Sequence, residues 1–113
     1  MDLKERIEAF VAHVTAIIKR NYEGSVLTPP VITADYISAK WCRITRSEIN
    51  GTGRSVYCFI CLQAGETKAL GKLTVGDIHK SATWKAPAKH ARGSVFSADF
   101  DNCAGPYGVV YLR

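Results

Sequence analysis

Residues that could do chemistry gather between Gly76 and Gly93, which reads GDIHKSATWKAPAKHARG. This segment holds two of the three histidines, a tryptophan and four Lys or Arg residues, and no acid follows Asp77 within it. Such a run favours a phosphate-bearing partner, because cations attract phosphates and an aromatic ring can stack on a base. The residues that we assign to this contact are Lys80, Trp84, Lys85, Lys89, His90 and Arg92.

The second half of the segment has the pattern of a short helix near residues 86–92, with Pro87 in its first turn. Lys85, Lys89 and Arg92 are spaced i, i+4, i+7 and would then share one face. The free amides and positive dipole end at such a helix start would add to an anion site. The sequence therefore predicts an anion-contacting surface; the alternative is a solvated basic face.

Residue spacing argues against a metal site and against catalysis. Cys58 and Cys61 have the spacing of a zinc or redox pair, but inside a strand their side chains point to opposite faces. His79 and His90 have no carboxylate or cysteine at matching spacing. The chain also lacks a nucleophile-elbow turn and a Walker-type loop. We expect a non-enzymatic protein with no catalytic residues, no metal and no cofactor.

The elements that must position this segment begin with an amphipathic helix within residues 1–23. Asp2 followed by Glu5 resembles a capping box. We expect the apolar stripe of this helix to pack on a sheet; the alternative is a dimer or partner helix. The stripe consists of Leu3, Ile7, Phe10, Val11, Val14, Ile17 and Ile18.

A linker and a sheet follow the helix. Residues 24–34 contain two adjacent prolines and are interpreted as an extended linker. From residue 35 apolar residues recur with a period of two, which is typical of strands. An Asn-Gly turn joins the first two strands into a hairpin. In the second strand Tyr57 and Phe59 should share one face, and apolar residues on both faces indicate a central strand. The expected strands are 36–46, 54–63, 78–84 and 109–112, while 64–75 fits either a strand or a loop.

These elements predict one α+β domain over residues 1–113. A long N-terminal amphipathic helix packs on a three- to four-stranded antiparallel sheet in 35–113, with one short helix near 86–92. The length of 113 residues suits a single domain. No apolar run could span a bilayer and no signal pattern opens the chain, so we expect a cytoplasmic protein with free thiols and no membrane contact.

The net charge of +5 is uneven along the chain. Residues 1–39 carry four Lys or Arg against five acids, whereas residues 40–113 carry eleven against five. A basic surplus in one part of a small domain favours nucleic acid or a nucleotide as the partner.

The segment at 76–93 resembles one in small bacteriophage proteins of unassigned function. The strand at 54–60 and the ending at 105–108 are similar to that group as well, and the resemblance covers roughly residues 36–113. Residues 64–75 look inserted by comparison. The resemblance implies a phage or prophage origin and a setting in the host cytoplasm, and it assigns no catalytic residues.

The leading hypothesis is a phage accessory protein that binds nucleic acid or a phosphate-rich ligand through residues 79–92. One alternative is a protein-binding inhibitor of a host enzyme or defence factor, whose acidic patch would meet the basic surface. Another is a binder or sequestering protein for a small signalling nucleotide. A homo-oligomer through the N-terminal helix is also compatible with the sequence.

Overall fold

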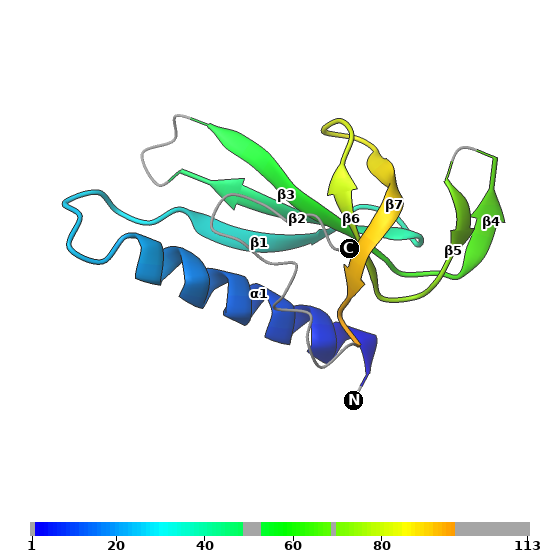
Figure 1. Cartoon of the computed structure of the whole chain (residues 1–113), viewed down its shortest axis with the longest axis horizontal. Helices are drawn as coiled ribbons and strands as arrows, with labels where there is room; N and C mark the ends of the chain where they lie inside the picture. The colour runs from blue at the N-terminus through cyan, green and yellow to red at the C-terminus, as the bar shows by residue number, and fades with distance from the viewer. Residues whose placement is uncertain (1, 49–52, 69, 97–113) are drawn as a thin grey trace.

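The structure is a computed structural model that describes residues 2–48, 53–68 and 70–96, with the backbone alone for His90 and Arg92 (Figure 1). Its main sheet has five antiparallel strands in the order β1-β2-β3-β6-β7, and β4 and β5 form a separate two-stranded sheet. The elements are α1 (Leu3–Asn21), β1 (Val31–Tyr36), β2 (Trp41–Ser47), β3 (Arg54–Cys61), β4 (Gly65–Thr67), β5 (Gly71–Leu73), β6 (Asp77–Ser81) and β7 (Pro87–Ser94).

The α1 helix confirms the expectation from the apolar stripe. The side chain of Asp2 caps it by accepting a hydrogen bond of 2.8 Å from the backbone N–H of Glu5. Lys19 and Arg20 lie in the last turn, where cations favour the helix dipole. Burial contributes about 1.5–3 kcal/mol per large apolar side chain, so the stripe anchors the helix. The buried residues of α1 are Ile7, Phe10, Val14 and Ile18.

The main core lies between α1 and one face of the five-stranded sheet (Figure 1). The rings of Phe10 and Tyr57 meet edge to face with centroids 6.3 Å apart. Arg6 Nε donates to the carbonyl oxygen of Val95 at 2.6 Å, which ties the helix to the chain just after β7. The sheet contributes Ile32, Cys42, Ile44, Cys58, Ile60 and Ile78 to this core.

A second set of buried side chains covers the other face of the sheet, which confirms β3 as a central strand. Cys58 and Ile60 point to the helix, so Phe59 and Cys61 point away from it, and both are fully buried. His79 pairs with Phe59 across β6 and β3 and is also buried. This face carries the candidate site.

A bulge corrects the expected direction of Tyr57. Ile44 pairs with Cys58 and the next residue, Thr45, pairs with Val56. Tyr57 is therefore an extra residue in β3, without a partner of its own in β2. The bulge turns Tyr57 toward α1, where its ring contacts Phe10. The strict alternation of side-chain directions assumed from the sequence could not predict the direction of Tyr57, because a bulge changes the pairing of both strands.

The predicted α+β fold class, with a three- to four-stranded sheet and a short helix near 86–92, is wrong. The described chain is mainly β, and its main sheet has five strands. The expected strand at 36–46 begins with the last residue of β1 and continues as β2 only from Trp41. Between them Ser38 Oγ accepts from the backbone N–H groups of Lys40 and Trp41 and turns the chain. The expected linker at 24–34 already contains the start of β1.

The predicted short helix is the edge strand β7. It pairs antiparallel with β6, with Ser81 opposite Pro87 and Ile78 opposite Gly93. Pro87 is the first residue of this edge strand, where a missing N–H is tolerated. Helix propensities differ by less than about 1 kcal/mol among ordinary residues, so pairing with β6 outweighs them. The anion site expected at a helix start is therefore not formed.

Within 64–75, β4 and β5 form a hairpin that stands apart from the main sheet (Figure 1). Three residue pairs join β4 to β5, and Gly71 begins β5 with φ at +73°. The expected strand at 78–84 ends at Ser81, and the one expected at 109–112 lies outside the described residues. Within the described ranges, no helix has the length and apolar character needed to cross a membrane.

Candidate nucleic-acid interface

Four of the six predicted contact residues are exposed on the β6–β7 hairpin. Lys80 lies in β6, Trp84 and Lys85 lie in the turn, and Lys89 lies in β7. The hairpin therefore groups these residues, although not on a helical face. His90 and Arg92 follow on the backbone of β7, and their side chains lie outside the description.

Thr83 builds the turn that presents Trp84. Its hydroxyl accepts hydrogen bonds from the backbone N–H groups of Lys85 at 3.2 Å and Ala86 at 3.1 Å. The backbone carbonyl of Ala86 also accepts from the N–H of Thr83. These local bonds give the turn a defined shape, and 39% of the Trp84 surface stays exposed.

Arg43 fixes Trp84 against the face of the main sheet that points away from α1. Its Cζ lies 4.1 Å from the centroid of the Trp84 ring, and its Nη1 donates to the Trp84 carbonyl oxygen at 3.2 Å. A guanidinium at this distance is attracted to the electron-rich face of the indole. Arg43 thus holds both the ring and the backbone of the turn.

A second guanidinium reaches the same ring from β3. Arg54 Cζ lies 5.5 Å from the Trp84 centroid, and Arg54 Nη2 lies 3.4 Å from the Asp35 carboxylate. Exposed ion pairs contribute only about 0–1 kcal/mol, so Arg54 can leave Asp35 for a phosphate at small cost. Its side chain is 56% exposed. We call Arg43, Arg54, Trp84 and Lys85 the Trp84 surface.

Sequence reasoning missed Arg43 and Arg54, because both lie far from the turn along the chain. Arg43 lies in β2 and Arg54 in β3, opposite Phe59 and Ser47 respectively, and both guanidinium groups lie over the Trp84 ring. The two-residue spacing of Trp41 and Arg43 does predict that they share one face of β2. The residues near Arg43 in the sequence do not indicate that the β6–β7 turn packs on this face of β2.

His79 is buried on the face of the main sheet that points away from α1. Its Nδ1 lies 2.8 Å from the carbonyl oxygen of Ala88, and a carbonyl can only accept, so Nδ1 carries the proton. Its ring packs edge to face against Trp41, with centroids 5.2 Å apart. Its Nε2 is buried and lacks a hydrogen-bond partner in the part of the chain that is described. His79 thus holds β6, β7 and Trp41 together.

The described cysteines are buried thiols. Burial raises the pKa of Cys42 to about 12, and burial also raises the pKa of Cys61. Cys58 packs in the core below α1. The thiolate is the nucleophilic and metal-binding form, so these raised pKa values disfavour both roles for Cys42 and Cys61.

Comparison with protein families gives one assignment. Residues 3–104 match DUF7717, a family of unknown function. The chain belongs to that family. Comparisons with curated proteins and with solved structures give no match. In this DUF7717 member, the matched residues include α1, the whole described sheet and the Trp84 surface.

Proposed function

We propose that this DUF7717 protein binds single-stranded nucleic acid through the Trp84 surface and the lysines of the β6–β7 hairpin. The observation that carries the proposal is the exposed indole of Trp84, held at 4.1 Å and 5.5 Å by two guanidinium groups. Proteins that bind single strands combine such stacking rings with a basic surface that follows the phosphates.

In this proposal a base stacks on the exposed part of the Trp84 ring, beside the guanidinium groups that already lie over it. Stacking of one base on an aromatic side chain contributes about 1–3 kcal/mol and tolerates every base, because each has a π-face. The bases of a duplex are already stacked on one another, so a ring in this position favours unpaired strands. Arg43 pins Trp84 in advance, which lowers the ordering cost of binding.

The charges of the β6–β7 hairpin suit a phosphate backbone. Lys80, Lys85 and Lys89 are exposed on the hairpin, and the sequence has no acid between residues 78 and 98. Cations that meet phosphates release condensed counterions, so this surface should bind more weakly as salt rises.

The proposed setting is that of a non-enzymatic phage accessory protein in the host cytoplasm. The resemblance of residues 76–93 to small bacteriophage proteins supports this setting. The inhibitor of a host factor and the nucleotide binder stay alternative predictions. A pull-down from nuclease-treated lysate distinguishes the inhibitor from a nucleic-acid binder. A host protein retained there in stoichiometric amount would favour the inhibitor.

The proposal is tested by fluorescence anisotropy with a labelled single strand and the matching duplex. We expect the Lys85→Glu, Lys89→Glu double variant to bind the single strand at least about tenfold more weakly, since reversal replaces attraction with repulsion. The matched control is Lys4→Glu, Lys19→Glu, which makes the same charge change at exposed positions of α1. Equal losses in both variants, or no binding by the wild type at low salt, would contradict the proposal.

A further inference from the structure

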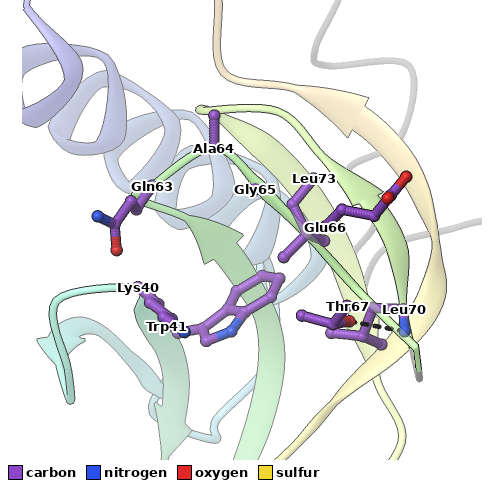
Figure 2. Close-up of a pocket in the computed structure, with 9 residues that line it drawn as sticks. All are labelled: Lys40, Trp41, Gln63, Ala64, Gly65, Glu66, Thr67, Leu70 and Leu73. Atoms are coloured by element: carbon purple, nitrogen blue, oxygen red, sulfur yellow. Dashed lines mark hydrogen bonds between the residues drawn. The ribbon is translucent and has the colours of Figure 1, made fainter.

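A pocket of about 290 Å³ lies between the start of β2, the segment that follows β3 and the β4–β5 hairpin (Figure 2). Figure 2 shows the indole of Trp41 turned toward Leu73 and the hairpin. The pocket shares no residue with the Trp84 surface. Its principal lining residues are Lys40, Trp41, Gln63, Thr67, Leu70 and Leu73.

Trp41 is held rigidly by the buried layer beneath it. Its ring meets Phe59 edge to face at a centroid distance of 6.3 Å and His79 at 5.2 Å. Phe59 is fully buried and His79 is 2% exposed, and the hydrogen bond to Ala88 fixes the His79 ring. Trp41 itself stays partly exposed at the pocket. A rigid ring that faces a hollow is suited to stack a flat ligand.

The wall opposite Trp41 is a hairpin with little packing of its own. All three residues of β4 are exposed, and in β5 Leu73 is buried at 5% exposure. A two-stranded hairpin alone is marginally stable in water. Thr67 Oγ1 accepts from the backbone N–H of Leu70 at 2.9 Å and shapes the hairpin end. A flat ligand placed between Trp41 and this wall would add the apolar contacts that the hairpin lacks.

We propose that this pocket holds the base of a nucleotide. The base stacks on Trp41, and Leu70 and Leu73 contact it from the hairpin side. The Gln63 amide and the Thr67 hydroxyl offer donors and acceptors for the edge of the base.

The pocket is lined by one cation, Lys40, and one anion, Glu66. Lys40 is exposed at the rim and can meet the phosphate. The carboxylate of Glu66 points away from the indole (Figure 2). The volume lies at the lower end of the range for small-ligand pockets, which favours one nucleotide over a larger cofactor.

The two tryptophans of the chain allow this pocket to be tested separately from the Trp84 surface. In a Trp84→Phe variant, Trp41 is the sole tryptophan reporter. We expect nucleoside monophosphates to quench its fluorescence saturably. Lys40→Glu in the same background should weaken the nucleotide more than the matching nucleoside, because only the nucleotide carries the phosphate. Nucleotide-dependent rise of the wild-type melting temperature gives a second readout that needs no tryptophan substitution.

The ligand that quenches Trp41 shows whether the base belongs to a free nucleotide or to a bound strand. Saturable quenching by mononucleotides supports a free nucleotide as the ligand. Quenching by a single-stranded oligonucleotide alone supports a base of a bound strand. If neither quenches Trp41 and no nucleotide raises the wild-type melting temperature, the pocket proposal is overturned. The Trp84 surface is assayed independently in Trp41→Phe, so either proposal can fail without the other.

Discussion

The guanidinium of Arg43 contacts Trp84 twice, lying 4.1 Å from the centre of its ring and donating a hydrogen bond to its carbonyl oxygen. The two residues are 41 positions apart, so this pair attaches the β6–β7 turn to strand β2. Trp84 therefore presents its exposed ring from a fixed position.

Removal of this attachment should loosen the turn without unfolding the domain. We expect Arg43→Ala to lower the free energy of unfolding by about 1–2 kcal/mol, from a cation–π contact and one hydrogen bond. In a Trp41→Phe background, acrylamide should then quench Trp84 more strongly. Arg54→Ala is the control, because its guanidinium lies further from the ring at 5.5 Å and its side chain is mostly exposed. Equal effects of the two substitutions would show that Arg43 has no special role.

Gly76 joins β6 to its neighbours at a position that excludes larger residues. Its φ is +89°, its N–H donates to the Cys61 carbonyl oxygen, and its own carbonyl accepts from the N–H of Val95. An added Cβ would lie 2.5 Å from Phe96 Cδ2. We expect Gly76→Ala to cost more than the left-handed strain of about 1–2 kcal/mol, because the half-exposed Phe96 side chain must also move aside.

Gly71→Ala provides the matched control for that substitution. Gly71 has φ at +73°, and no atom of the described residues lies within 4 Å of its added Cβ. Only the left-handed strain of about 1–2 kcal/mol remains. Denaturant unfolding of both variants checks the difference, and equal losses of stability would contradict the close contact with Phe96.

Asp77 should make stability depend on pH in a predictable direction. Burial raises the pKa of Asp77, against the opposing effects of the Thr74 N–H and of His79. A raised carboxyl pKa favours the protonated form in the folded state, so its contribution is full at low pH and is lost as pH rises through the raised pKa. Asp77→Asn keeps an acceptor for Thr74 and should melt higher than wild type at neutral pH. That difference should vanish at acidic pH; a difference independent of pH would refute the assignment.

The buried thiols should react only when the domain opens. In a Cys103→Ser variant, the remaining cysteines are Cys42, Cys58 and Cys61, all buried. We expect a disulfide reagent to leave them unmodified at neutral pH, since burial raises the pKa of Cys42 to about 12 and also that of Cys61. All three should react together in denaturant. Fast modification of one thiol in the native protein would show that it is accessible.

Features set by near neighbours in the chain could be predicted from the sequence. The apolar stripe of α1 and the cap at Asp2 depend on contacts three or four residues apart, and both are confirmed. The two-sided burial of β3 follows from apolar residues on both of its faces. The predicted lysines and Trp84 do lie on one hairpin, because they are close in sequence.

Features set by distant pairing could not be predicted in this way. The cations around Pro87 have helical spacing, yet this segment pairs with β6 as a strand. The bulge that turns Tyr57 toward α1 depends on the register of two strands. Arg43 and Arg54 reach Trp84 only through the order of strands in the sheet, for which the sequence near the turn holds no signal.

The most direct test of nucleic-acid binding uses Trp84 as its own reporter. In Trp41→Phe, Trp84 is the sole tryptophan. We expect a single-stranded oligonucleotide to quench its fluorescence saturably, with log affinity falling against log salt at a slope of about −2 to −3 for three or four phosphate contacts. Unchanged Trp84 fluorescence at low salt, or binding whose affinity does not respond to salt, would contradict the proposed interface.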